Sequence, residues 1–136
     1  MSYESQMLVK YSMPSRIEVE RALLQSLLKN GGTVEEFNTG QEIVNNIADV
    51  FGLTEEQRTA FLETTYRKEN RLKKSNLWNR LLFRAADSLA KDKLLSRPTE
   101  TIKLTNQKEW MLTEKGYDKA LKLSNISLKS KNFLQT

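Results

Sequence analysis

The sequence predicts a mainly α domain with a small β hairpin, in the order of a winged helix-turn-helix. Apolar residues recur at helical spacing in several separate stretches, and capping signals precede the first of them. Two short stretches of strand character follow the longest of these helices, as in a hairpin. With 136 residues, the chain has the length of one domain.

Three capping boxes predict where the first helices begin, because Ser or Thr three residues before Glu or Gln satisfies amide groups at a helix start. They are Ser15 with Glu18, Thr39 with Glu42, and Thr54 with Gln57. The first helix is expected to end at Gly31-Gly32 and the second at Gly52, since glycine tolerates the left-handed C-cap conformation. The third is expected to be short and to run through Leu62.

The longest helix is expected in the second half of the chain. The polar stretch 63–75 shows no clear period and is interpreted as a loop or a ragged helix. Over 77–90, apolar residues repeat at three and four positions, which predicts about four helical turns. Ser75 or Asn76 can cap this helix, and Trp78 is expected in the core.

A hairpin and a last helix are expected after it. Pro98 forbids helix continuation, and the β-branched residues of 101–105 predict a strand. Residues 110–112 form the expected returning strand, with Trp110 in the core. The last helix is expected from Glu114 to about residue 123.

Three segments result from this pattern. Residues 1–13 are expected to form an N-terminal arm or a short strand, and 14–123 the winged-helix domain. Residues 124–136 are rich in serine, lysine and asparagine and are expected to be a flexible C-terminal tail.

The composition argues against most enzymes. The chain has neither cysteine nor histidine, which removes disulfides, most zinc chemistry and the usual nucleophile–histidine pairs. Glu35-Glu36 and Glu55-Glu56 are acidic pairs, but neighbouring helical residues do not share a face. There is no phosphate-binding loop or dinucleotide fingerprint. We therefore expect no catalysis, no metal and no cofactor.

The distribution of apolar residues predicts the cellular compartment of the protein. The sequence has no apolar run of about 18 residues and no signal-peptide pattern at its start. We expect a cytoplasmic, nucleoid-associated protein without a membrane partner.

Charge is distributed unevenly along the chain. Residues 1–62 hold five basic and nine acidic residues, whereas 63–136 hold seventeen basic and eight acidic ones. Between Tyr66 and Arg84 there are seven basic residues and one acidic one. This asymmetry favours a polyanionic partner on one side of the molecule, although a basic surface kept for solubility is the alternative.

The candidate base readers lie near the start of the long helix, where a recognition helix reaches base edges. Arg80 and Arg84 lie four residues apart on one helix face, and arginine is suited to bidentate contact with guanine or phosphate. Asn79 is a candidate adenine reader, and Asn76 is a candidate cap or ligand. The alternative is a solvated face in which Arg84 pairs with Asp87.

The remaining candidate contacts are basic or polar residues on either side of that helix. Lysines and arginines before it are expected to bind phosphates: Arg67, Lys68, Arg71, Lys73 and Lys74. Four residues are expected at the wing tip: Lys103, Asn106, Gln107 and Lys108.

From Pro14 to about Ala120, the chain resembles the N-terminal domain of Mrr-type restriction-system proteins, a winged-helix domain. The matching pieces are Gly31-Gly32 after a leucine-rich helix, Gly52-Leu53-Thr54-Glu55-Glu56, Asn79-Arg80 before Ala85 to Leu89, and Trp110-Met111-Leu112-Thr113-Glu114-Lys115-Gly116. The chain departs from the family pattern in the spacing at Phe83-Arg84-Ala85 and in having Lys108-Glu109 where a glycine commonly precedes the last strand. The resemblance implies DNA binding without the family's nuclease.

The expected function is therefore that of a non-catalytic DNA-binding protein, either a recognition module of a restriction system or a small transcriptional regulator. Its expected partner is double-stranded DNA, and a homodimer or a separate nuclease or other protein subunit stays open. The alternative is a protein–protein adaptor, such as a phage- or plasmid-encoded inhibitor that docks a host protein through the same basic surface.

Overall fold

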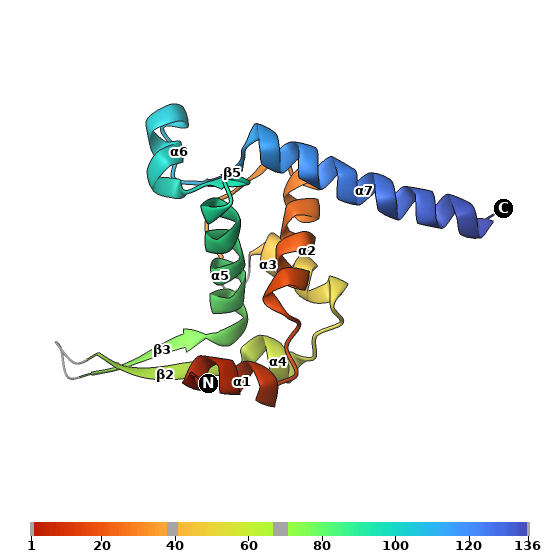
Figure 1. Cartoon of the computed structure of the whole chain (residues 1–136). Helices are drawn as coiled ribbons and strands as arrows, with labels where there is room; N and C mark the ends of the chain where they lie inside the picture. The colour runs from red at the N-terminus through yellow and green to blue at the C-terminus, as the bar shows by residue number, and fades with distance from the viewer. Residues whose placement is uncertain (1, 38–40, 67–70, 136) are drawn as a thin grey trace.

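The computed structural model describes residues 2–37, 41–66 and 71–135, with side chains described over 2–37, 41–63 and 74–124. These residues form seven helices and five strands (Figure 1): α1 (Tyr3–Lys10), α2 (Arg16–Lys29), β1 (Thr33–Val34), α3 (Glu42–Val50), α4 (Glu55–Thr59), β2 (Phe61–Tyr66), β3 (Arg71–Asn76), α5 (Leu77–Lys91), β4 (Leu95–Ser96), α6 (Pro98–Thr105), β5 (Trp110–Leu112) and α7 (Glu114–Gln135). The expected mainly helical fold with a small antiparallel sheet is confirmed.

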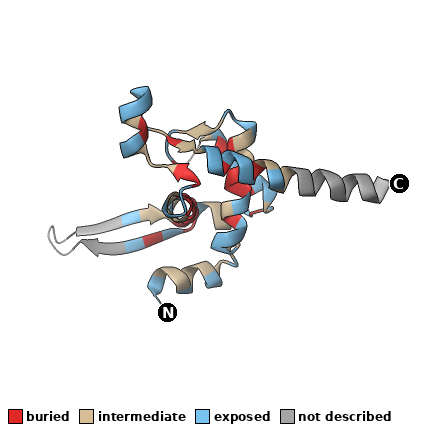
Figure 2. Ribbon diagram, turned by 45° about the horizontal axis from the view of Figure 1, so that its top comes forward, coloured by how far each residue is buried: buried red, intermediate tan, exposed pale blue. Residues whose placement is uncertain are grey.

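The core lies where α5 packs against α2. Leu23 and Leu27 of α2 and Leu82 of α5 are fully buried, and these residues belong to one apolar cluster. Trp78, 1% exposed, donates a hydrogen bond from its indole nitrogen to the Val44 carbonyl on α3 (3.2 Å). The predicted long helix and its buried tryptophan are therefore confirmed, and Figure 2 shows the buried residues gathered where these helices meet.

A three-stranded antiparallel sheet closes one end of this core. Its order is β1-β5-β4, so the last strand lies between the other two. Val34 pairs with Trp110, and Leu95 pairs with Leu112. Trp110 is 4% exposed, as expected for a core residue on the returning strand.

The predicted strand over 101–105 is wrong, because these residues form helix α6. Pro98 occupies the first turn of α6, where its missing amide hydrogen costs nothing and its fixed φ suits the helix. Thr101 is fully buried and donates its hydroxyl to the Arg97 carbonyl (3.0 Å), so the β-branched residue is satisfied within the helix. Asn106 ends α6 in the left-handed conformation, with φ of 66°.

The stretch 63–75, expected as a loop or ragged helix, instead belongs to an antiparallel hairpin of β2 and β3. The preceding helix α4 also ends at Thr59 rather than running through Leu62. At the base of the hairpin, Leu62 packs in a small cluster with Ala60 and Leu77. The sequence of 63–75 lacks the apolar alternation by which a half-buried strand is predicted, so no local pattern indicates these strands.

Both ends of the described chain are helical. Residues 3–10 form α1 rather than a strand, with Ser2 accepting a capping hydrogen bond from the Ser5 amide. Helix α7 continues to Gln135, past the end expected near residue 123. The serine-rich composition suggested a tail, but 124–135 contain neither glycine nor proline to stop a helix.

Two predicted helix starts are confirmed. The Ser15 hydroxyl accepts from the Glu18 amide, and Thr54 and Gln57 form a complete capping box. For the second box, Thr39 lies outside the described residues; α3 begins at Glu42, and the side chain of Gln41 at its N-cap makes no capping hydrogen bond.

Gly116 is a position where the fold requires glycine. A Cβ there would lie 1.9 Å from the Leu94 carbonyl oxygen. We predict that Gly116→Ala lowers the free energy of unfolding by about 1–3 kcal/mol or more, because backbone must shift to admit the methyl group. Urea unfolding measures this, with Lys119→Ala, exposed one turn further along α7, as the control. Equal stability of Gly116→Ala and wild type would contradict this close contact.

Candidate nucleic-acid interface

The outer face of α5 is the central feature of the candidate site. Because its apolar face is buried against α2, residues 80, 83, 84 and 87 point outward at helical spacing. The β2–β3 hairpin and α6 lie at opposite ends of α5 and extend away from α2 (Figure 1). The outer face of α5 therefore lies between two projecting elements.

Arg80 and Arg84 are both paired with Glu4 of α1. Arg80 Nε donates to Glu4 Oε1 at 2.6 Å, and Arg84 donates to Oε2 at 2.9 Å. The pairing of Arg84 with Asp87, considered from the sequence, is not formed; Asp87 instead pairs with Arg97 and Lys91. Arg97 therefore braces the start of α6 against α5.

Sequence reasoning missed Glu4 because 76 residues separate it from Arg80. An ion pair between elements so far apart leaves no local spacing signal, and the segment that carries Glu4 was not expected to be helical.

The two asparagines at the start of α5 have local structural contacts. Asn76 caps the helix, since its side-chain oxygen accepts from the Asn79 amide at 2.9 Å. Its side-chain nitrogen donates to the Arg58 carbonyl at 2.8 Å. Asn76 was a candidate cap or DNA ligand, and the structure shows it as the helix cap. Asn79 lies half-buried in the first turn.

The predicted phosphate contacts that the structure describes lie on β3 of the hairpin. Lys74 is exposed, lies 5.0 Å from the Phe61 ring centre and forms a 3.8 Å ion pair with Glu63. Arg71 and Lys73 lie on β3. Predicted contacts Arg67 and Lys68 lie outside the described residues.

The four residues expected at a wing tip lie on α6 and in the turn that follows it. Lys103 is on the exposed side of α6, Asn106 caps its end, and Gln107 and Lys108 precede β5. All four are exposed. The structure therefore brings them together, but at a helix end rather than at the tip of a β hairpin.

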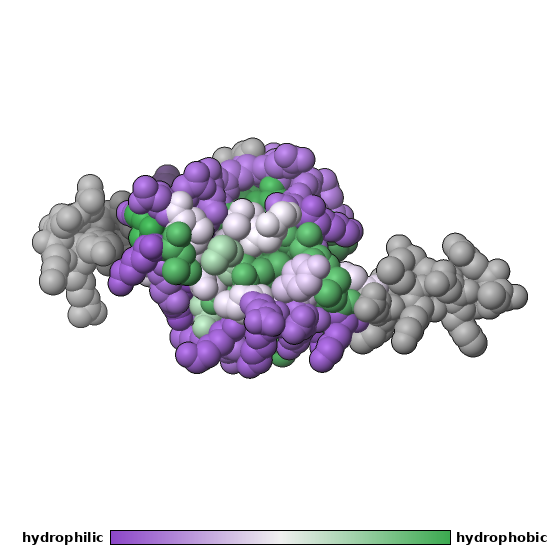
Figure 3. Space-filling view, turned by 90° about the horizontal axis from the view of Figure 1, so that it is seen from above, coloured by the Kyte–Doolittle hydropathy of each residue, from purple (hydrophilic) through white to green (hydrophobic). Residues whose placement is uncertain are grey.

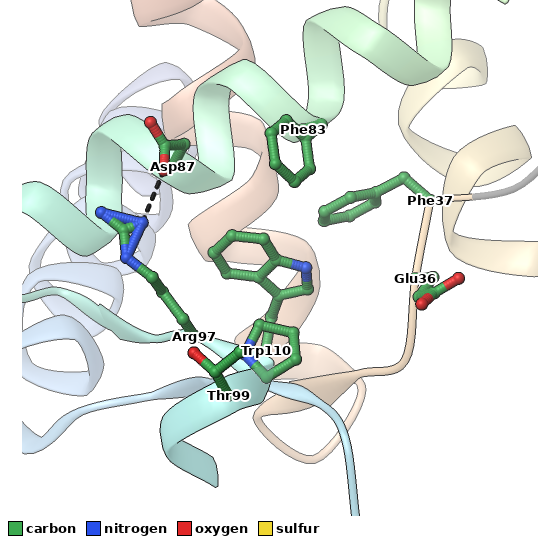
Figure 4. Close-up of a pocket in the computed structure, with 8 residues that line it drawn as sticks. Glu36, Phe37, Phe83, Asp87, Arg97, Thr99 and Trp110 are labelled. Carbon is green, nitrogen blue, oxygen red and sulfur yellow. Dashed lines mark hydrogen bonds and ion pairs between the residues drawn. The ribbon is translucent and has the colours of Figure 1, made fainter. Parts of the chain in front are cut away.

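An aromatic pocket of about 470 Å³ lies between α5, the start of α6 and β5 (Figure 4). Phe83 is 53% exposed, whereas Phe37 and Trp110 are buried, so Phe83 offers most of the open aromatic surface. Phe83 packs edge-on against Trp110, with ring centres 5.8 Å apart. The Asp87–Arg97 ion pair forms the polar side of the pocket. Its lining residues come from separate segments of the chain, so no local spacing in the sequence predicts this pocket.

A second depression, of about 480 Å³, lies between the end of α2, β1, β5 and the start of α7. Leu28 and Leu112 line it, and Tyr117 is 48% exposed at this place. Figure 3 shows apolar groups running across the middle of the face seen from above, between polar margins.

Over the described residues, no three His, Cys, Asp or Glu side chains gather closely enough to hold a metal ion. In the same part of the chain, none of the helices has the length and apolar character needed to cross a membrane.

Comparison with protein-family models, curated proteins and solved structures yields no match. The resemblance to the Mrr-type domain therefore stays a prediction.

The cap geometry predicts a structural effect of Asn76. Replacing Asn76 with alanine removes both the capping acceptor and the donor to Arg58, which should lower the free energy of unfolding by about 1–2 kcal/mol. Asn76→Asp keeps the acceptor and should cost less. Urea unfolding tests this, with Asn45→Ala at an exposed position of α3 as the control. If Asn76→Ala proves as stable as the control, the cap is not formed in solution.

Proposed function

We propose that the chain is a non-catalytic, winged-helix DNA-binding protein of the cytoplasm or nucleoid. The element order α2, β1, α3, α5, β4, β5 and the sheet order β1-β5-β4 support this class. Two features distinguish the chain from a standard winged helix. The β2–β3 hairpin precedes the long helix, and α6 lies where a winged helix carries its wing.

The observation that carries the proposal is the position of the arginine pair. Arg80 and Arg84 lie on the outer face of α5, between the basic β2–β3 hairpin at one end and the exposed polar residues after α6 at the other. An α-helix fits a major groove about 12 Å wide, and elements at both ends of it can then contact the flanking backbone.

Each group has a distinct task in this arrangement. Arg80 and Arg84 present planar guanidinium groups to guanine edges or phosphates. The lysines and arginines of the hairpin, with Lys103 and Lys108, neutralise phosphates and set orientation without reading sequence. In line with the resemblance, the protein would act as a recognition module of a restriction system, with any nuclease on a separate subunit, or as a small regulator.

Loss of the arginine pair should reduce duplex affinity. Relative to wild type, Arg80→Ala/Arg84→Ala should bind a DNA duplex at least about tenfold more weakly, because two directed cationic contacts are lost. The dependence of log affinity on log salt should flatten by about 0.9 for each phosphate contact removed. Fluorescence anisotropy across a salt series measures both quantities.

The matched control is Arg16→Ala/Arg21→Ala, which removes the same charge from exposed positions of α2. It should retain most of the affinity. If both double variants lose the same duplex affinity, the loss is due to net charge alone. That result would contradict the placement of α5 in the groove. Urea unfolding verifies that both variants fold.

The hairpin should contribute affinity without sequence preference. Arg71→Ala/Lys73→Ala on β3 should weaken binding to specific and random duplexes by the same factor, because phosphate contacts carry no sequence information. Competition between a selected and a random duplex measures the ratio of the two affinities, which should be the same for the variant and wild type. A changed ratio would show that the hairpin reads bases.

A protein adaptor is the second candidate, favoured by the apolar depression beside Tyr117. Such a protein would bind duplex DNA weakly and without preference at physiological salt, and Tyr117→Ala would then impair partner capture.

A further inference from the structure

We propose that Arg80 and Arg84 form a phosphate site, and that Glu4 of α1 occupies this site in the free protein. The proposal rests on the proposed DNA-binding function. It assigns the ligand, a backbone phosphodiester, and an internal competitor for the same two arginines.

The geometry is that of a bound oxyanion. Each carboxylate oxygen of Glu4 contacts a different arginine: Oε1 contacts Arg80 at 2.6 Å, and Oε2 contacts Arg84 at 2.9 Å. A phosphodiester likewise presents two anionic oxygens, and arginine pairs bind both groups with charge-assisted hydrogen bonds. Glu4 therefore stands in for a phosphate on the face of α5 that would enter the groove.

The two arginines are accessible enough to exchange this partner. The Arg80 side chain is 33% exposed and that of Arg84 56% exposed, whereas Glu4 is 21% exposed. An incoming phosphate would keep both guanidinium groups paired, so neither would be left as an uncompensated charge. Only Glu4 would need to move out into solvent.

Helix α1 is attached in a way that permits this movement. None of its eight residues is buried, and Leu8, which packs half-buried against the main core, lies in its second half. Its apolar contacts with the small Leu62 cluster lie in its second half and just beyond it, where Met7, Leu8 and Tyr11 pack. The Gln57 side chain also donates to the Tyr11 carbonyl at 2.9 Å. The turn with Glu4 can therefore leave while the other end stays attached.

The consequence for DNA binding is a lowered intrinsic affinity. Every duplex must displace Glu4 before it reaches the two arginines, and the displaced contact subtracts from binding. Duplexes that make further contacts along α5 overcome this competition better than those that bind through phosphates alone. Glu4 thus suppresses weak, non-specific binding.

The test is a double-mutant cycle on duplex affinity with the full chain. Glu4→Gln should bind DNA about three- to tenfold more tightly than wild type, the range expected for losing ion pairs of this exposure. In the Arg80→Ala/Arg84→Ala background, Glu4→Gln should have no more effect than the matched control. Glu18→Gln, at an exposed position of α2, is that control for net charge.

Each outcome separates the competing accounts. Unchanged or weaker binding by Glu4→Gln, while the double arginine variant loses affinity, would overturn the competition and make Glu4 a residue that positions the arginines. A gain equal to that of Glu18→Gln would overturn it as well. Absence of duplex binding by wild type and every variant would overturn the proposed function itself.

Hydrogen exchange supplies an independent readout. Saturating duplex DNA should speed amide exchange in the first turn of α1, because Glu4 loses its partners, while it slows exchange in α5. Slower exchange in both helices would contradict displacement of Glu4.

Discussion

Burial of one face of α5 against α2 is the constraint on which the rest of the structure depends. Trp78, Leu82 and their neighbours occupy the centre of the core, and the hydrogen bond from Trp78 to Val44 fixes the rotation of α5 about its axis. Once this rotation is set, Arg80 and Arg84 must point outward. The candidate interface is therefore a direct consequence of the core.

A second and smaller set of contacts positions what surrounds this helix. Leu62 and Leu77 pack together, and the Leu77 amide donates to the Ala60 carbonyl at 2.9 Å, which joins the base of the hairpin to the start of α5. Helix α1 rests on the same cluster. The base of the hairpin and helix α1, which carries Glu4, thus share a local support beside the main core, and a change there should alter both together.

The sequence predicted the helices that carry a wide apolar stripe and missed elements that lack one. Helical spacing located α2 and α5, and core spacing placed Trp78 and Trp110 correctly. The hairpin carries no apolar alternation, so nothing local distinguished it from a loop. The β-branched residues of 101–105 predict a strand, but these residues form α6, where Thr101 is buried and donates its hydroxyl to the Arg97 carbonyl within the helix. Tertiary context decided both cases.

The residues of the candidate site likewise fall into those that the local sequence predicts and those that it does not. Arg80 and Arg84 could be selected because spacing and charge lie in the local sequence, whereas Glu4 and the Phe83 pocket arise from contacts between distant segments.

The most direct test of the proposed interface is an NMR titration of the labelled protein with a DNA duplex. The largest amide shifts should fall in the first turns of α5, the hairpin and α1, with little change in α2. Shifts centred on Tyr117 and the start of α7, with α5 unaffected, would contradict the proposed interface.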